Sequence, residues 1–173
     1  DIHMVPIRVH FGDRSYLDKV GLTAEEFFVE IARNPQHPKT SQPPPGDFRR
    51  QFEFLGSHFD SVVSLNLSRQ VSGTCGAAEA AAARVSTHGK VTVLDSMNAS
   101  LGQGLVAMYA AECALAGYDA ARVIEATRAI VPRTLTFGLV GSLEYAVRGG
   151  RVPRWVKNVA DALQLMPVLH NDR

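Results

Sequence analysis

Short apolar runs alternate with helical segments along most of this chain, and that alternation restricts its fold more than any other feature. The runs 61–67 and 90–95 have the composition of buried strands, and 134–140 is a third strand-like run. An alanine-rich helix is expected at about 74–87, between the first two strands, and two more helices are expected before the third. This rhythm predicts right-handed crossovers and an α/β fold, with a mainly parallel sheet that carries helices on both faces.

The first sixty residues carry three local signals. Alternating apolar residues at 5–11 predict a strand with one buried face. Thr23 and Glu26 have the spacing of a capping box, which predicts that a helix begins there. The prolines concentrated at 35–45 exclude a helix in most of that segment and predict a stiff, extended loop, after which a helix resumes near Pro45.

The last forty residues differ in character and predict a second domain. We expect residues 1–132 to form an N-terminal α/β domain and residues 133–173 to be the incomplete start of a second α/β domain. A helix is expected after Pro153, with Trp155, Val156, Val159 and Leu163 facing inward, and a strand is expected to begin near residue 166. Both ends of the chain therefore look cut.

Composition and charge exclude several classes of protein. With 46% hydrophobic and 20% charged residues, the chain is typical of a soluble globular protein. Its 18 basic and 17 acidic groups leave a net charge of +1, which argues against a dedicated nucleic-acid binder. The longest uninterrupted apolar stretch, 105–111, is far shorter than the ~20 residues of a membrane span, so no stable membrane insertion is expected. Cys75 and Cys113 match no metal pattern and predict reduced thiols in a cytoplasmic protein.

Motifs for common catalytic chemistry are weak or absent in the sequence. Residues 102–107 fit G-x-G-x-x-A, but they do not directly follow a strand, so we interpret these glycines as packing a helix close to the sheet. There is no P-loop, no G-x-S-x-G elbow and no histidine pair with metal-ligand spacing. Cys75 would lie in the first turn of a helix, where a thiolate is favoured, although a small buried cysteine is the commoner role. The sequence therefore implies no metal and no cofactor.

Two polar loops favour the binding of an anion. Residues 71–74 (Val-Ser-Gly-Thr) lie where a strand ends and a helix begins, so free amides, the helix dipole and two hydroxyls would converge there. Ser72 could instead be an ordinary N-cap. Residues 39–43 (Lys-Thr-Ser-Gln-Pro) form a second polar loop braced by prolines, or an ordinary capped turn. The loop 95–100 also follows a strand and could line the same crevice.

These segments together resemble the DegV family. The resemblance rests on 39–43, on 71–74, on Asp-Ser at 95–96 with Ser-Leu-Gly at 100–102, and on Gly-Gly-Arg at 149–151. Their order and spacing agree along essentially the whole chain. Members of the family are bacterial fatty-acid-binding proteins that present the fatty acid to a separate fatty-acid kinase. The resemblance therefore implies a lipid-binding carrier that is not an enzyme, with a fatty acid and a fatty-acid kinase as its partners.

The resemblance also implies a carboxylate site. In the family, hydroxyls and neighbouring amides at a helix N-terminus hold the carboxyl group, and a basic side chain lies near the head group or on the surface that faces the kinase. The matching positions of this chain are Thr40 or Ser41, Ser72, Gly73, Thr74 and the basic Arg151. In the family a first strand would precede residue 1, and most of the second domain would follow residue 173.

Two other functions stay open on the sequence alone. One is a small α/β transferase or hydrolase that uses Ser72 or Cys75 on an anionic substrate. The other is an interaction module whose basic stretch at 122–157 docks a partner, although solvated helix faces explain most such stretches.

Overall fold

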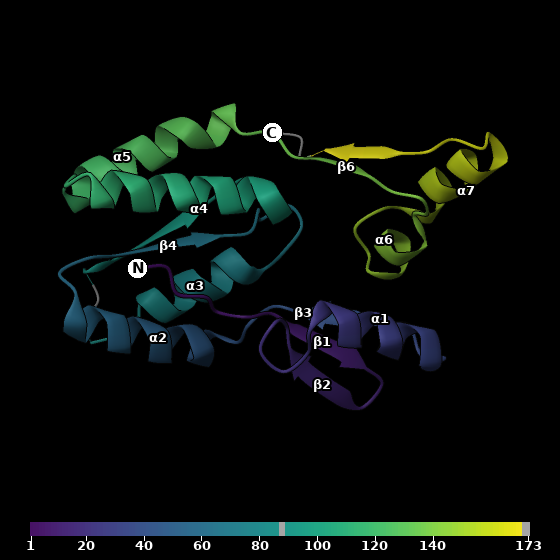
Figure 1. Cartoon of the computed structure of the whole chain (residues 1–173), viewed down its shortest axis with the longest axis horizontal. Helices are drawn as coiled ribbons and strands as arrows, with labels where there is room; N and C mark the ends of the chain where they lie inside the picture. Colours follow the sequence, from purple (N-terminus) through teal and green to yellow (C-terminus); the bar gives the residue numbers. More distant parts are fainter. Residues whose placement is uncertain (87–88, 171–173) are drawn as a thin grey trace. The chain divides into compact units, whose positions relative to one another are not determined.

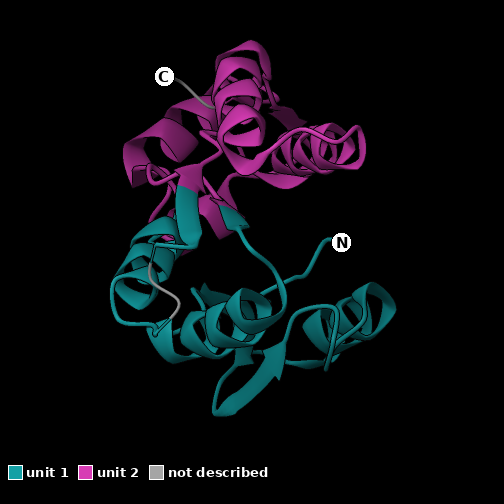
Figure 2. Cartoon of the chain, turned by 90° about the vertical axis from the view of Figure 1, so that its left-hand side faces the viewer, with its two compact units in different colours: residues 1–64, 72–93 teal, residues 65–71, 94–173 magenta. Residues whose placement is uncertain are grey.

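The computed structural model describes residues 1–86 and 89–170 of the chain (Figure 1). The chain divides into two compact units, drawn in teal and magenta in Figure 2. Unit 1 comprises Asp1–Ser64 and Ser72–Val93, and unit 2 comprises Leu65–Val71 and Leu94–Arg173. No helix in the described ranges combines the length and the apolar content that crossing a bilayer requires. The domain boundary expected between residues 132 and 133 stays a prediction.

A three-stranded antiparallel sheet begins unit 1. In chain order the elements of this unit are β1 (Arg8–Phe11), β2 (Arg14–Leu17), α1 (Ala24–Arg33), β3 (Lys39–Ser41), α2 (Pro45–His58) and α3 (Thr74–Ala82). The strands lie in the order β2-β1-β3. Gly12 and Asp13 alone connect β1 to β2, and Gly12 has a φ of 57°, which favours glycine. Val9 and Phe11 are buried together with Leu22, which confirms the predicted buried face for this part of 5–11, although the strand begins only at Arg8.

The predicted start of α1 is confirmed. The Glu26 amide donates to the Thr23 hydroxyl over 3.2 Å, and the Thr23 amide donates to the Glu26 carboxylate over 2.8 Å. These two bonds satisfy amides that would otherwise lack a partner at the first turn. The helix expected near Pro45 is also present as α2, with Pro44 as its N-cap.

The helices α2 and α3 enclose a core of unit 1. Its buried residues are Phe48, Phe52, Ala77, Ala78, Ala81 and Val85. The alanines let the backbone of α3 approach the two phenylalanine rings of α2 closely. The helix ends at Ala82, earlier than predicted, and residue 87, where we expected the end, lies outside the described residues. The alanine-rich sequence carries no stop signal before Gly89, so its end could not be located from the pattern.

A parallel pair of strands confirms the predicted α/β fold. β4 (Val62–Asn66) and β5 (Val91–Asp95) form a two-stranded parallel sheet, and α3 lies between them in the chain. The other described strands pair antiparallel. For β1 and β2 the two-residue connection permits no other arrangement, because parallel neighbours need a long crossover. The apolar pattern of the sequence does not distinguish these directions.

Helices predominate in unit 2. After the ends of β4 and β5, its elements are α4 (Ser100–Leu115), α5 (Ala120–Ile130), a 3-10 turn (Val131–Arg133), β6 (Phe137–Leu139), α6 (Glu144–Arg148), α7 (Arg154–Ala162) and β7 (Val168–His170). Gly117, with a φ of 84°, lies between α4 and α5. The Asp119 carboxylate accepts from the Arg122 amide over 2.8 Å, as expected for the cap of α5. β6 and β7 pair antiparallel, so the strand predicted near residue 166 is present.

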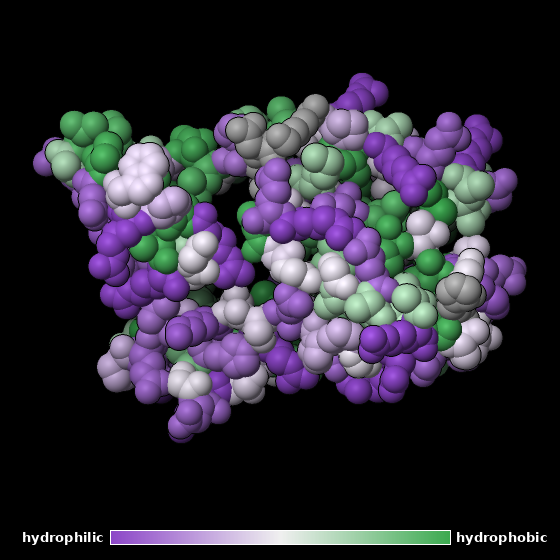
Figure 3. All heavy atoms as spheres, turned by 180° about the vertical axis from the view of Figure 1, so that it is seen from behind, coloured by the Kyte–Doolittle hydropathy of each residue, from purple (hydrophilic) through white to green (hydrophobic). Residues whose placement is uncertain are grey.

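The predicted inward face of α7 is wrong for the described chain. Trp155, Val159 and Leu163 are 67%, 49% and 63% exposed, Val156 is half-buried, and Ala160 is the buried residue of this helix. Figure 3, seen from behind, shows hydrophobic atoms at the surface at its upper left, where the segment of α7 lies. Apolar spacing identifies one face of a helix, but it does not say that a neighbour covers that face.

Candidate functional site

The turn before α3 carries the predicted anion-binding residues of unit 1. The hydroxyls of Ser72 and Thr74 lie 2.7 Å apart, and the Thr74 amide donates to the Ser72 hydroxyl over 3.3 Å. The N-cap of α3 is Gly73, which offers no side chain, so Ser72 is not itself the cap residue. Thr74 is buried, Ser72 is half-buried and Gly73 is exposed. The turn therefore presents a hydroxyl and helix N-terminal amides at a surface that solvent reaches.

The segment with Thr40 and Ser41 is a strand and not a loop. These residues belong to β3, an edge strand in which Thr40 is opposite Val9 and Ser41 is opposite Arg8. Successive side chains of a strand point to opposite faces, so the two hydroxyls do not point to the same side. The Ser41 hydroxyl lies 2.8 Å from Nε2 of His10, which is on its face of the sheet. Thr40 therefore lies on the face of the sheet that carries the buried Val9, and Ser41 lies on the opposite face.

Gln42 joins the two predicted segments within unit 1. A Cβ added to Gly73 would lie 2.0 Å from Oε1 of Gln42 and 2.8 Å from its Cδ. The carboxamide that follows β3 therefore occupies the space beside Gly73 at the start of α3. Gln42 is part of the sequence motif at 39–43, but the motif alone predicts no role for it. One signal in the sequence could have identified it. Gly73 stands at a predicted helix start, and the predicted carboxylate site requires the segments 39–43 and 71–74 to lie close together.

Arg151 lies in unit 2 and is held by backbone carbonyls. It follows α6, whose C-cap is Gly149, and Gly150 turns the chain with a φ of 76°. Its Nε donates to the Val71 carbonyl over 3.2 Å, and its Nη1 donates to the Gly149 carbonyl over 2.5 Å. Val71 directly precedes Ser72 in the chain. The guanidinium is exposed but oriented.

Charged side chains link α6 to α7 in unit 2. Glu144 accepts from Arg148, and Lys157 lies 3.4 Å from Glu144 and 2.6 Å from Asp161. The hydrogen bond from Arg148 holds the pKa of Glu144 below its usual range; desolvation opposes this shift, and Lys157 adds to it. The hydrogen bond to Asp161 raises the pKa of Lys157.

The loop after β5 forms a sealed polar network within unit 2. Ser96 and Asn98 are 0% and 1% exposed. The Asn98 side-chain amide donates to the carbonyls of Ser96 and Thr134, and its oxygen accepts from the Thr136 hydroxyl. A Cβ on Gly102 would lie 2.0 Å from the Thr136 hydroxyl oxygen, whereas one on Gly104 would meet nothing within 4 Å. Gly102 is therefore needed for close packing, as we interpreted it, but against side chains and not against the sheet.

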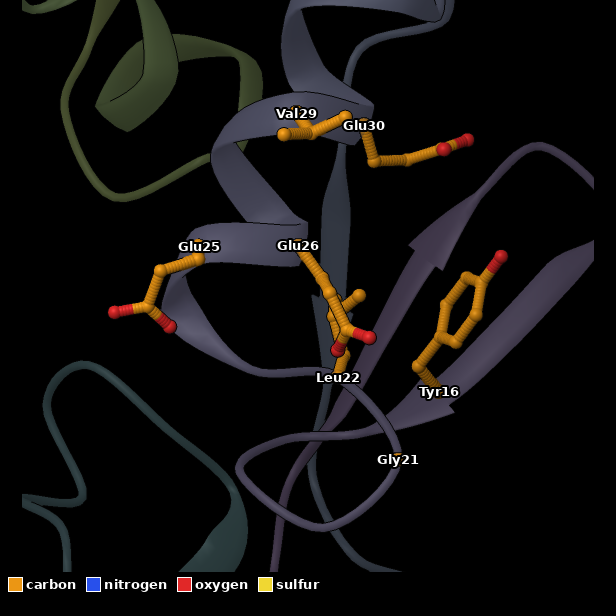
Figure 4. A pocket seen from close by; sticks show the side chains of 7 residues that line it. All are labelled: Tyr16, Gly21, Leu22, Glu25, Glu26, Val29 and Glu30. Atoms are coloured by element: carbon orange, nitrogen blue, oxygen red, sulfur yellow. The ribbon is translucent and has the colours of Figure 1, made fainter.

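A pocket of about 380 Å³ lies beside the start of α1 (Figure 4). Its lining includes the carboxylates of Glu25, Glu26 and Glu30, together with Tyr16 and the buried Leu22. Three carboxylates around one hollow disfavour an anionic ligand. None of the predicted site residues lines this pocket.

Cys75 and the possible metal ligands do not form a reactive site in the described chain. Cys75 is fully buried, which agrees with the structural role and not with an accessible nucleophile. Within residues 1–86 and 89–170, no three His, Cys, Asp or Glu side chains gather as metal ligands would.

Comparisons with known proteins relate the chain to one family. A family model described as "Uncharacterised protein, DegV family" matches residues 1–173. Protein DegV from Bacillus subtilis (strain 168) is 32% identical over 172 residues, which make up 99% of this chain and 61% of that protein. The chain thus spans about 61% of the length of this relative.

Solved structures of similar fold carry names that concern fatty acids. The crystal structure of DegV, a fatty acid binding protein from Bacillus subtilis, matches with a TM-score of 0.85 and 30% identity, over 99% of this chain and 61% of that one. A DegV family protein from Thermus thermophilus, described for its fatty acid binding, matches with a TM-score of 0.84 and 33% identity, over 97% of this chain and 59% of that one.

Proposed function

This chain belongs to the DegV family, and we propose that it binds a long-chain fatty acid and holds the carboxylate at the start of α3. Thr40 and Ser72 donate their hydroxyls, and the amides of Gly73 and Thr74 lie close by. Two similar structures, at 30% and 33% identity, are named for fatty acid binding, which supports the class of ligand. The carboxylate accepts these hydrogen bonds without needing a catalytic base.

The contact of Gln42 with Gly73 carries the proposal for the head-group site. It brings the end of β3 to the start of α3, so the two family motifs meet in one unit. A helix N-terminus favours negative charge because its first amides have no partner within the helix. An exposed Gly73 leaves that end accessible. Within unit 2, the guanidinium of Arg151 is held by the carbonyls of Val71 and Gly149, and the family resemblance implies that it lies near the head group or on the surface that faces the kinase.

Burial of the acyl chain supplies most of the affinity in this proposal. A long chain has roughly fourteen methylenes, and burying each contributes about 0.8 kcal/mol, or ~11 kcal/mol in all. Immobilising the flexible chain removes part of this gain. The hydroxyls and amides add selection for a carboxylate over other head groups.

The protein acts as a carrier in this proposal and presents the carboxylate to a separate fatty-acid kinase. Phosphoryl transfer relies on a metal and a nucleotide, which the kinase would hold. The carrier then needs only to fix the carboxylate and leave it reachable. The partner follows from the family resemblance, and the half-buried position of Ser72 is compatible with access from outside.

Substitution of Ser72 tests the head-group assignment. A hydrogen bond to a charged group contributes about 1.5–3 kcal/mol, so Ser72→Ala should weaken fatty-acid binding roughly 10- to 150-fold in a titration with palmitate or oleate. A fatty alcohol of the same length should bind poorly to the parent and change little.

Ser142→Ala is the matched control for this test. The Ser142 hydroxyl accepts from the Glu144 amide over 3.2 Å at the start of α6, much as the Ser72 hydroxyl accepts from Thr74. This variant should bind the fatty acid as the parent does. Equal affinity of Ser72→Ala and the parent would show that the hydroxyl serves the turn alone.

A further inference from the structure

The contact that distinguishes Gly73 is one of space and not of backbone conformation. The φ of −76° and ψ of 5° of Gly73 are open to any residue. A Cβ at this position would lie 2.0, 2.8 and 3.1 Å from Oε1, Cδ and Nε2 of Gln42, so the carboxamide at the end of that side chain would have to shift. Gly76, one turn further along α3, would meet nothing within 4 Å. The contact is therefore specific to the start of the helix.

The backbone on both sides of Gln42 is fixed. Ser41 belongs to the β3 ladder, and Pro43, which follows Gln42, is buried to more than 98%. Pro44 and Pro45 then begin α2. Because the segment is extended, residues two apart lie on the same face, so the side chains of Thr40 and Gln42 leave it on the same side.

We propose that Gln42 is a positioning residue, which sets the distance between the Thr40 hydroxyl and the Ser72–Thr74 turn by seating its carboxamide over Gly73. This inference rests on the proposed function. When the carboxamide is displaced, the two hydroxyls no longer match the oxygens of one carboxylate. The acyl chain is still buried, so the loss falls on head-group recognition alone.

A substitution at Gly73 directly tests the contact between this residue and the Gln42 carboxamide. Gly73→Ala should lower the affinity for palmitate about tenfold, because one charged hydrogen bond of the pair is lost. The affinity for hexadecanol should change less than about twofold, since it depends on the buried chain. Gly76→Ala makes the same chemical change in the same helix and should leave both affinities unchanged. Circular dichroism and thermal unfolding are the controls that establish whether each variant is folded.

The double variant separates positioning from an independent effect. Gln42→Ala should weaken palmitate binding by itself, and Gln42→Ala/Gly73→Ala should bind palmitate no more weakly than Gln42→Ala, because no carboxamide is left to displace. Gln42→Met, which keeps the length of the side chain, should restore palmitate binding to within about threefold of the parent. Additive losses in the double variant, failure of Gln42→Met, or normal binding by Gly73→Ala would each overturn the inference.

The outcome for Ser72→Ala keeps the two proposals apart. If Ser72→Ala loses palmitate affinity while the variants at 42 and 73 do not, the site is correct and the positioning role is wrong. If Ser72→Ala also binds palmitate normally, the head-group site itself is wrong.

Discussion

The starts of α3 and α4 are built alike, but they differ in how their polar groups are satisfied. Each helix follows a strand of the parallel pair, and each carries a glycine near its start where a Cβ would lie 2.0 Å from a polar side-chain oxygen. At α4 that glycine is Gly102 and the oxygen belongs to Thr136; at α3 they are Gly73 and Gln42. The close approach alone therefore does not mark a ligand site.

The difference lies in what satisfies the polar groups. At the start of α4, the Asn98 side chain is buried and its donors and acceptor bond to three neighbours. Met97 and Ser100 adopt φ values of 50° and 52°, a cost that the surrounding bonds must offset. At the start of α3, Gly73 is exposed and the Ser72 hydroxyl bonds only within its own turn among the described residues. The start of α4 is therefore sealed, because its polar groups are buried and hydrogen-bonded, whereas the start of α3 is open to solvent.

The largest effect on stability should come from disrupting the sealed polar network at the start of α4. Asn98→Ala removes a side chain with three hydrogen bonds and leaves two or more buried groups unpaired, at about 1–3 kcal/mol each, so the free energy of unfolding should fall by about 2–6 kcal/mol. Urea unfolding of the variant and the parent measures this loss. A loss below about 1 kcal/mol, in the range of ordinary surface substitutions, would contradict the sealed description.

A pair of glycines in α4 gives the next effect. Gly102→Ala forces a methyl group against Thr136 and Asn98 and should destabilise the protein by about 1–3 kcal/mol. Gly104→Ala, two residues on, meets open space and should stabilise the helix by about 0.5–1 kcal/mol. Thermal unfolding of both variants compares them, and the same sign for both would show that helix propensity and not close packing decides the result.

Substitutions of the Thr40 and Ser41 hydroxyls test which of them contributes to palmitate binding at the start of α3. Thr40→Ala should weaken palmitate binding about tenfold, the lower limit for a hydrogen bond to a charged group. Ser41→Ala should leave it unchanged, because Ser41 points to the opposite face and bonds to His10. Isothermal titration measures both, and a loss confined to Ser41→Ala would reverse the assignment.

The sequence predicted the positions of helices and strands better than the residues against which they pair and pack. The capping box at Thr23, the cap at Asp119 and the strand–helix alternation all depend on residues close together in the chain, and the structure contains them. The antiparallel pairing of β3 and the exposed face of α7 depend on distant residues, and local periodicity does not contain that information.

The candidate site shows the same limit. The motifs located Thr40, Ser41 and Ser72 along the chain, but the face on which each hydroxyl lies follows from the register of β3 with β1. The role of Gln42 follows from a contact across 31 positions, since it lies beside Gly73. Such a contact leaves no local pattern, and only the resemblance to a family indicated that these segments belong together.

The smallest effect should come from the exposed charges between α6 and α7, which belong to neither helix start. Arg148 lowers the pKa of Glu144, so the folded state holds its proton less tightly than the unfolded state does. The ionised Glu144 therefore stabilises the protein above the usual carboxyl range, and this contribution is lost as the pH falls through the lowered pKa. Glu144→Gln should melt slightly below the parent at neutral pH, and the difference should vanish in acid and shrink in 1 M NaCl, which screens exposed charges. Differential scanning calorimetry across pH and salt measures it. Palmitate affinity should not change, because the open start of α3 contains no member of this cluster; a loss of affinity in Glu144→Gln would mean that binding depends on the segment that carries Arg151.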